Sequence, residues 1–151
     1  MKYTIKKGRH FANFTINRLF PFSSKIDKGT VKFSKECLAI APISGRNKLT
    51  GIAGFDNHKN SGRLVWQSDG NMIKIWGYVY KDGVRTEKYI TSLEVEKEYE
   101  YEVEFADGRW IFEIKGNITS LSGKIGFWKF KQYPYFGGLS PAPLTMSLWI
   151  G

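Results

Sequence analysis

The sequence is poor in the residues that build disulfide frameworks and metal centres. It contains one cysteine, Cys37, and two histidines among 151 residues. A single cysteine excludes an internal disulfide framework and most cysteine-based metal sites. Cys37 lies between apolar neighbours and no activating pattern surrounds it, which predicts a buried thiol that fills space. We therefore expect no metal site and no cofactor.

Long apolar segments are also missing. The amino-terminal stretch MKYTIKKGRHF has no apolar region of the kind that secretory signals carry. No run of residues is long enough to cross a membrane. We expect synthesis in the cytoplasm without a signal peptide, and no membrane insertion.

Charge is unbalanced without being concentrated. Lys and Arg total 23 against 14 Asp and Glu, so the net charge is +9 and the pI is about 9.6. The basic residues occur in small scattered groups, and no nucleic-acid motif is present. This predicts solubility and diffuse attraction to anionic surfaces, and specific nucleic-acid recognition is not expected. A nucleic-acid-associated protein stays a weaker alternative, for which affinity would fall steeply with salt.

Aromatic residues and glycines, by contrast, are abundant, at 16% of the chain and 16 residues respectively, which favours a turn-rich β protein. The clearest alternation runs over 94–105, where tyrosines and other apolar residues line one face and glutamates the other. About ten short strands and no helix predict one all-β domain over residues 1–151, an antiparallel β-sandwich of the jelly-roll type whose terminal strands pair. Outside the central hairpin, further strands are expected at 3–6, 29–34, 37–43, 84–90, 109–115, 123–130 and 145–150, whereas 49–55 leads into the loop before the hairpin.

A hairpin at 62–80 is the centre of the predicted fold. The two strands, 62–67 and 72–80, are joined by a turn containing Asp69-Gly70. Strand alternation places Ile73, Ile75 and Val79 on the core face. The other face, formed by Lys74, Trp76, Tyr78 and Tyr80, is either a solvent-facing aromatic platform or the second buried face of a sheet covered on both sides.

Three segments together resemble a known group of proteins. They are Asn57-His58-Lys59-Asn60-Ser61-Gly62-Arg63 with Trp66, Tyr78-Val79-Tyr80, and Tyr133-Pro134-Tyr135-Phe136-Gly137-Gly138 with Ala142-Pro143. The resemblance is to an uncharacterised family of small bacterial and bacteriophage proteins with a concanavalin A-like (lectin/glucanase) jelly-roll sandwich, and it covers most of 49–151. That family has a histidine after the Ala-Pro pair, where this chain has Leu144.

The resemblance implies that glycans bind on one sheet or at its rim loops. Sugar recognition needs aromatic faces against the C–H face of a pyranose and planar polar groups that fork onto hydroxyls. Each candidate also has a structural alternative, because aromatic residues pack in sandwiches and polar loops close turns. The candidate ligand-binding residues are His58, Asn60, Arg63, Trp76, Tyr78, Tyr80, Tyr133 and Tyr135.

Catalysis has weaker support in the sequence. The paired-carboxylate motif of glucanases is absent, and the clustered glutamates of 94–105 are expected to form a solvated face. A polysaccharide lyase would place His, Tyr, Arg and Gln or Asn on one face, for which His58, Arg63, Gln67 and Tyr78 are a loose set.

The sequence therefore favours a non-enzymatic jelly-roll binding or structural module. Most specifically, it predicts a bacteriophage virion accessory protein, associated with the head or a fibre, that contacts host glycans. Capsid or other virion proteins are the expected partners, and self-association through exposed sheet edges is also expected. The alternative is a polysaccharide lyase or hydrolase.

Overall fold

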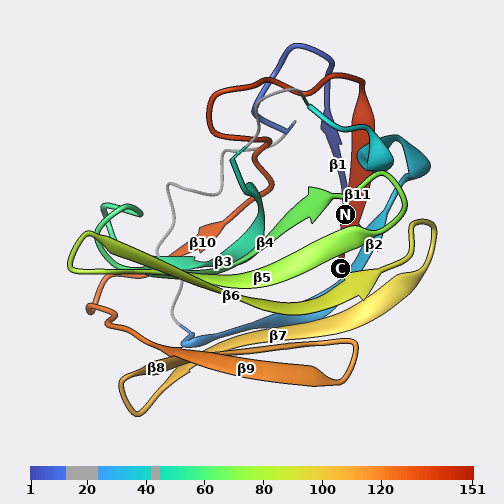
Figure 1. Ribbon diagram of the computed structural model, residues 1–151. Helices are drawn as coiled ribbons and strands as arrows, with labels where there is room; N and C mark the ends of the chain where they lie inside the picture. Colours follow the sequence, from blue (N-terminus) through green and yellow to red (C-terminus); the bar gives the residue numbers. More distant parts are fainter. Residues whose placement is uncertain (13–23, 42–44) are drawn as a thin grey trace.

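Two antiparallel sheets pack face to face in the computed structural model, which describes residues 1–12, 24–41 and 45–151 (Figure 1). The six-stranded sheet contains, in spatial order, β1 (Lys2–Ile5), β11 (Met146–Ile150), β2 (Ile26–Phe33), β7 (Glu98–Ala106), β8 (Arg109–Ile114) and β9 (Asn117–Ser122). The five-stranded sheet contains β10 (Phe130–Gln132), β3 (Asn47–Ala53), β4 (Ser61–Ser68), β5 (Ile73–Lys81) and β6 (Val84–Leu93). The predicted all-β antiparallel sandwich is confirmed.

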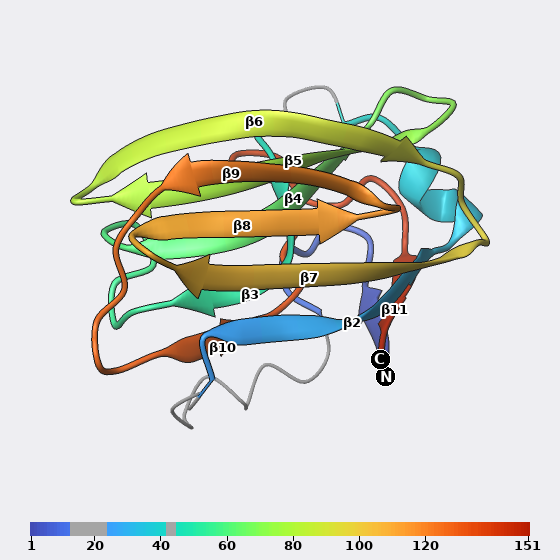
Figure 2. The ribbon, with the colours of Figure 1, turned by 90° about the horizontal axis from the view of Figure 1, so that it is seen from below.

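The apolar rows of the sequence form the core between the two sheets. On β7, Tyr101 and Val103 are buried, while the glutamates that alternate with them are partly or fully exposed. Trp110, Phe112 and Ile114 of β8 are fully buried, as the alternation predicts. Figure 2 shows β7 and β8 side by side in the sheet on the far side of the core from β4 and β5.

The central hairpin forms as predicted, with β4 and β5 paired from Ser61↔Tyr80 to Ser68↔Ile73. Ile73, Ile75 and Val79 are fully buried in the core. The opposite face belongs to the outer side of the five-stranded sheet. Neighbouring side chains nevertheless bury Tyr78 there to 3% exposure. This face of β5 is therefore turned toward solvent, but neighbouring side chains partly cover its aromatic rings.

Two glycines bring the sheets close together at this hairpin. A Cβ at Gly62 would lie 2.1 Å from Cδ2 of Trp110, and one at Gly77 would lie 2.5 Å from Cδ2 of Phe112. The large rings of β8 thus occupy the space that side chains of β4 and β5 would fill. This close approach is a reason for glycine in two strand interiors.

One carboxylate is buried between the sheets. Asp27 of β2 is 2% exposed and accepts a hydrogen bond from Thr50 Oγ1 at 2.5 Å. Its other oxygen accepts from Lys131 Nζ at 2.6 Å and from Tyr101 Oη at 3.2 Å. Every oxygen of the buried group therefore has a partner, as a buried charge requires.

The prediction of a buried strand over 37–43 is wrong for its described part. Lys35–Leu38 is a 3-10 turn, in which the amide of Cys37 donates to the carbonyl of Ser34. A short apolar run cannot be told from a buried turn by periodicity. The thiol is buried as expected, and burial raises the pKa of Cys37 to about 12. Residues 42–44 lie outside the described ranges, as do 13–23.

The predicted strand over 123–130 is also wrong. Lys115 and Gly116 both have positive φ, at 54° and 73°, so the chain reverses there and pairs as β9 with β8. Residues 123–129 form no strand, and β10 begins only at Phe130. The weak alternation of Asn117–Ser122 hid this edge strand, because most of its residues are wholly or partly exposed.

The two ends of the chain meet, as predicted. β1 pairs with β11 from Lys2↔Trp149 to Ile5↔Met146, and the amino terminus donates to the carbonyl of Ile150 at 2.7 Å. The N and C markers lie side by side in Figure 2. Within the described ranges, no helix has the length and apolar character that spanning a membrane requires.

Candidate functional site

Three cations gather on the outer side of the five-stranded sheet. Strand pairing places Lys48 of β3, Arg63 of β4 and Arg85 of β6 on the same side as Tyr78 of β5. Lys48 Nζ lies 5.4 Å from the centroid of the Tyr78 ring, and the guanidinium carbons of Arg63 and Arg85 lie at 5.5 Å and 6.0 Å. We call the surface formed by these four residues the basic face. Its charge suits an anionic ligand.

The amino group of Lys48 is the most perturbed cation of this surface. Burial, followed by repulsion from Arg63 and Arg85, lowers the pKa of Lys48 to about 8. Its Nζ donates to the carbonyl of Arg46 at 2.7 Å. The proton of Lys48 can therefore leave near neutral pH, which is unusual for a lysine.

Tyrosine hydroxyls line up along β5 beside these cations. The rings of Tyr78 and Tyr80 are 5.6 Å apart. Burial, helped by a hydrogen bond to Tyr78, raises the pKa of Tyr80. A hydrogen bond to Tyr78 also raises the pKa of Arg85. A phenol hydroxyl both donates and accepts hydrogen bonds, so this row can pair with sugar hydroxyls.

A glycine makes room for Arg63. Gly51 pairs with Arg63 across β3 and β4 and has a φ of 149°. A Cβ at Gly51 would lie 2.9 Å from Cγ of Arg63 and 2.3 Å from the carbonyl oxygen of Gly62. Gly51 therefore lets the arginine side chain lie across β3 toward Lys48.

A pocket of about 430 Å³ opens beside the basic face. It lies where the loop before β4 and the segment after β10 meet β3. Backbone hydrogen bonds of 2.8 Å and 3.1 Å tie Lys48 to Tyr135, and Asn47 Oδ1 accepts from the amide of Gly137 at 2.6 Å. Among its lining residues are Lys48, Asn57, His58, Arg63, Tyr133 and Tyr135.

Four of the predicted ligand residues line this pocket, namely His58, Arg63, Tyr133 and Tyr135. Two more adjoin it. Tyr78 lies beneath the cations, and the ring of Tyr80 meets that of His58 edge-on with centroids 5.4 Å apart. His58 is exposed, whereas Tyr133 is 7% exposed and belongs to the core cluster. The structure thus brings together segments that are about 75 residues apart in the chain.

The last two predicted residues neither line the pocket nor adjoin it. Asn60 closes the loop before β4, where its Oδ1 accepts from the amide of Asp82 at 3.1 Å. Trp76 is covered on one face by Arg46, whose guanidinium carbon lies 3.6 Å from the ring centroid. Two hydrogen bonds of 3.1 Å from Arg46 to Glu87 hold that arrangement. Gln67, the lyase-set candidate, accepts a hydrogen bond from Arg46 instead of facing the pocket.

Sequence reasoning missed Lys48, Asn57, Arg85 and Gln132. Asn57 Nδ2 donates to Gln132 Oε1 at 3.5 Å, so the two amides join the pocket to β10. Asn57 belongs to a segment quoted for the resemblance but was not named as a ligand residue, and no local motif marks the other three. Their neighbourhood depends on the order β10-β3-β4-β5-β6, which the sequence did not give. Arg85 lies on the expected strand 84–90, whereas Lys48 lies where no strand was expected.

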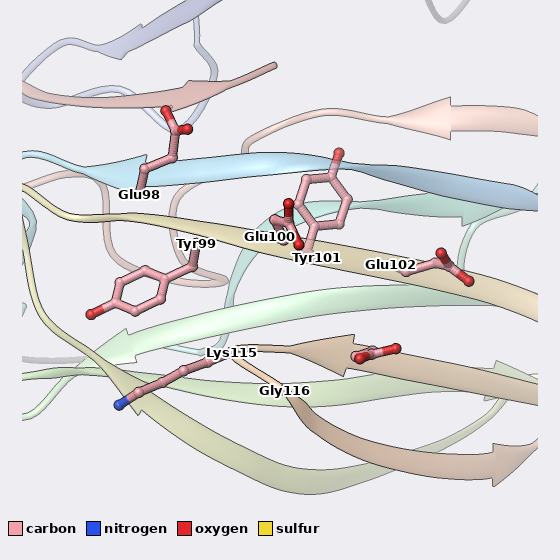
Figure 3. A pocket seen from close by; sticks show the side chains of 8 residues that line it. Glu98, Tyr99, Glu100, Tyr101, Glu102, Lys115 and Gly116 are labelled. Carbon is pink, nitrogen blue, oxygen red and sulfur yellow. The ribbon is translucent and has the colours of Figure 1, made fainter.

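The glutamates of β7 form a different surface on the other sheet. Glu98, Glu100 and Glu102 follow one another along the outer side of β7, and Figure 3 shows them spread along the strand instead of meeting at one point. Lys28 and Lys32 of β2 pair across from Glu102 and Glu98. No group of three potential metal ligands occurs within the described ranges. The expectation of a solvated face fits this arrangement.

Comparison with known proteins identifies the fold. No model of a known protein family matches the sequence, and no curated protein matches it either. Family 7 alginate lyase A1-II′, solved with a product, superposes with a TM-score of 0.60 and 15% identity over 93% of this chain and 66% of that chain. Alginate lyase AlyC3 gives 0.63 and 10% over 99% and 72%.

A third solved structure is the catalytic domain of an endo-1,3-β-glucanase (laminarinase) from Thermotoga petrophila RKU-1, with a TM-score of 0.58 and 10% identity over 99% of this chain and 73% of that chain. The present chain spans 66% of the first lyase's length. At these identities the likeness establishes the fold alone. It confirms the concanavalin A-like jelly-roll sandwich, whereas membership of a bacterial or bacteriophage family stays a prediction.

Proposed function

We propose that the protein binds an acidic polysaccharide along the basic face and the adjoining pocket. The observation that carries this proposal is the gathering of Lys48, Arg63 and Arg85 within 6.0 Å of one tyrosine ring. Carboxylates of a uronic acid polymer match guanidinium and ammonium groups, and the phenols and amides nearby match sugar hydroxyls. The likeness to two alginate lyases and a laminarinase supports a polysaccharide as the ligand.

Calorimetric titration with a polyuronate and with a neutral β-glucan tests this proposal. We expect the polyuronate to bind and the neutral polymer to bind far more weakly. Arg85→Gln should weaken polyuronate binding about tenfold, the loss of one charge-assisted contact. Arg109→Gln removes the same charge from the outer side of β8 and should change little. Equal losses in the two variants would show that only net charge matters.

A lyase is the second candidate, favoured because His58, Lys48, Arg63 and two tyrosines line one pocket. In β-elimination a base removes the proton beside the uronate carboxylate, the bond from C4 to the glycosidic oxygen breaks, and a C4–C5 double bond forms. The departing oxygen takes a proton from an acid. Arg63 is placed to neutralise the carboxylate, while His58, Lys48 and a tyrosine supply groups able to move the two protons.

Ultraviolet absorbance of the unsaturated product separates binding from cleavage. If the protein is a lyase, incubation with a polyuronate raises this absorbance steadily, and His58→Ala abolishes the rise while retaining most of the affinity. Tight binding with no absorbance change supports a non-enzymatic module. Unchanged turnover in His58→Ala would remove the proposed role of the imidazole.

We propose a virion accessory role separately, on the sequence resemblance. Density-gradient sedimentation of a lysate from a producing culture tests it, since a virion component travels with a large particle at fixed stoichiometry. Protein that stays free at low mass would contradict that role and leave glycan binding to be tested by itself.

A further inference from the structure

A cluster of exposed aromatic side chains lies next to the pocket, at the end of the sheet where β3 and β10 run side by side. Phe55 is 77% exposed, Phe127 is 85% exposed and Trp128 is 48% exposed. The ring of Phe55 lies 5.9 Å from Trp128 and 5.1 Å from Phe130, between centroids. We call Phe55, Trp128 and Phe130 the aromatic rim. A soluble protein rarely exposes such a group without a partner for it.

The aromatic rim is continuous with the pocket. A hollow of about 260 Å³ is lined by Phe55 and Phe130 together with Asn57 and Gln132. Asn57 also lines the 430 Å³ pocket that contains Arg63. A further hollow of about 470 Å³ is lined by Phe55 and Trp128. Each depression therefore shares a residue with the next, from Arg63 to Trp128.

The chemistry along this path alternates rings with polar groups. The amides of Asn57 and Gln132 lie between the cations and the rings, and Lys59 and Asn60 line the last hollow beside Trp128. A surface built for a helix or a lipid would be more uniformly apolar. Rings flanked by amides match a pyranose, which has an apolar C–H face and a hydroxyl edge.

We propose that the aromatic rim is a second carbohydrate subsite, which stacks on sugar rings of the same polysaccharide chain that the basic face holds by its carboxylates. This inference rests on the proposed function, because the rim extends that site. The ligand is then an elongated polymer, and the affinity depends on the length of the polysaccharide. A short acidic oligosaccharide reaches the basic face alone, whereas a longer one covers both.

Titration with a uronic acid disaccharide and with a much longer oligouronate tests the subsite. The wild type should bind the longer ligand more tightly than the disaccharide. Trp128→Ala should lose about tenfold for the longer ligand, within the range of a stacking contact, and nothing for the disaccharide. Phe55→Ala should give the same pattern. Ile118→Ala, which removes an exposed side chain from β9, is the control and should match the wild type for both ligands.

The contrary outcomes are distinct. If both lengths bind the wild type equally and Trp128→Ala changes neither affinity, the subsite is wrong and the basic face stands. If no oligouronate binds at any length, the proposed function fails and the subsite fails with it. If sedimentation equilibrium shows a dimer that Trp128→Ala dissociates, the rim is an interface between copies of this chain and the inference is overturned.

Discussion

At the scale of single residues, buried charged side chains affect both the stability of the fold and the binding site. Asp27 is 2% exposed and is held by Lys131, Thr50 and Tyr101 from both sheets. A paired charge in the interior contributes little net stability, but removing one partner leaves the other uncompensated. The Asp27–Lys131 pair and the cation Lys48 therefore give separate predictions for stability and binding.

Lys131→Met should lower the free energy of unfolding by about 3 kcal/mol, because the Asp27 carboxylate then stays buried without a counter-charge. Urea unfolding followed by fluorescence measures this. Lys124→Met is the matched control, since it breaks an ion pair with Asp82 in which both side chains are more than half exposed. That variant should unfold like the wild type. A loss as large in the control would contradict the role of burial.

The charge on Lys48 should make ligand binding depend on pH. Its pKa in the folded protein is about 8, so it is charged below that pH and neutral above it. Affinity for a polyuronate should fall about tenfold between about pH 7 and about pH 9, and Lys48→Met should bind weakly and equally at both. Calorimetry at the two pH values decides. A wild-type affinity that does not change would show that Lys48 does not contact the ligand.

The same lysine has an opposite effect on stability. In the unfolded chain Lys48 has its ordinary pKa of 10.5. Between pH 8 and pH 10.5 the unfolded chain therefore binds more protons than the folded chain. The Lys48 contribution to stability therefore rises with pH across this window. It is absent in Lys48→Met, which chemical denaturation at several pH values will show.

Among the elements, β4 and β5 connect the core to the basic face. Their inner sides carry Gly62 and Gly77 against the rings of β8, and their outer sides carry Arg63 and Tyr78. The approach of the two sheets and the position of Arg63 are thus set by the same two strands. A substitution on the inner side of β4 or β5 should therefore alter the packing of the two sheets.

Gly62→Ala should cost about 2 kcal/mol of stability, because the new Cβ would overlap the fully buried Trp110 ring. Gly126→Ala is the control, since nothing lies within 4 Å of its added Cβ. Thermal unfolding compares the two variants. If Gly62→Ala has the same melting temperature as the wild type, the two sheets are not packed at this point as closely as the contact with Trp110 requires.

Elements with a strong period were predictable from sequence, and those shaped by turns were not. The alternation on β7 and β8 and the Asp69-Gly70 turn before β5 gave those strands directly. The 3-10 turn at Lys35–Leu38 was not predicted, because it overlaps the apolar run that starts at Cys37, and an unbroken apolar run has no period. β9 was missed because the tight turn that joins it to β8 begins at a positive-φ lysine, Lys115, where glycine or asparagine is the usual residue.

On the scale of the whole molecule, the two outer surfaces differ in charge. The five-stranded sheet carries Lys48, Arg63 and Arg85, whereas on the six-stranded sheet the β7 glutamates lie opposite Lys28 and Lys32 of β2. A polyanion is therefore drawn more strongly to the five-stranded sheet than to the six-stranded one. The sequence showed only the sum of +9, because strand order decides which charges share a surface.

Because of this asymmetry, we expect the affinity for a polyuronate to depend strongly on salt, and this dependence to come from the charges of the basic face. Affinity for a polyuronate should fall at least tenfold between about 50 mM and about 200 mM salt. Glu102→Gln, on the far sheet, should leave the slope of affinity against salt unchanged, whereas Arg85→Gln should reduce it. Titrations at several salt concentrations give both slopes. Equal slopes in all three proteins would mean that the charges of the basic face do not contact the polymer.

The most direct test of the account is to map where an acidic oligosaccharide binds. Heteronuclear NMR of the labelled protein, titrated with an oligouronate, reports the backbone amides that change. We expect saturable chemical-shift changes in β3, β4, β5 and β6 and in the segment around Tyr133 to Gly138, and none in β7 and β8. Shifts concentrated on the glutamates of β7, or none that saturate, would contradict it.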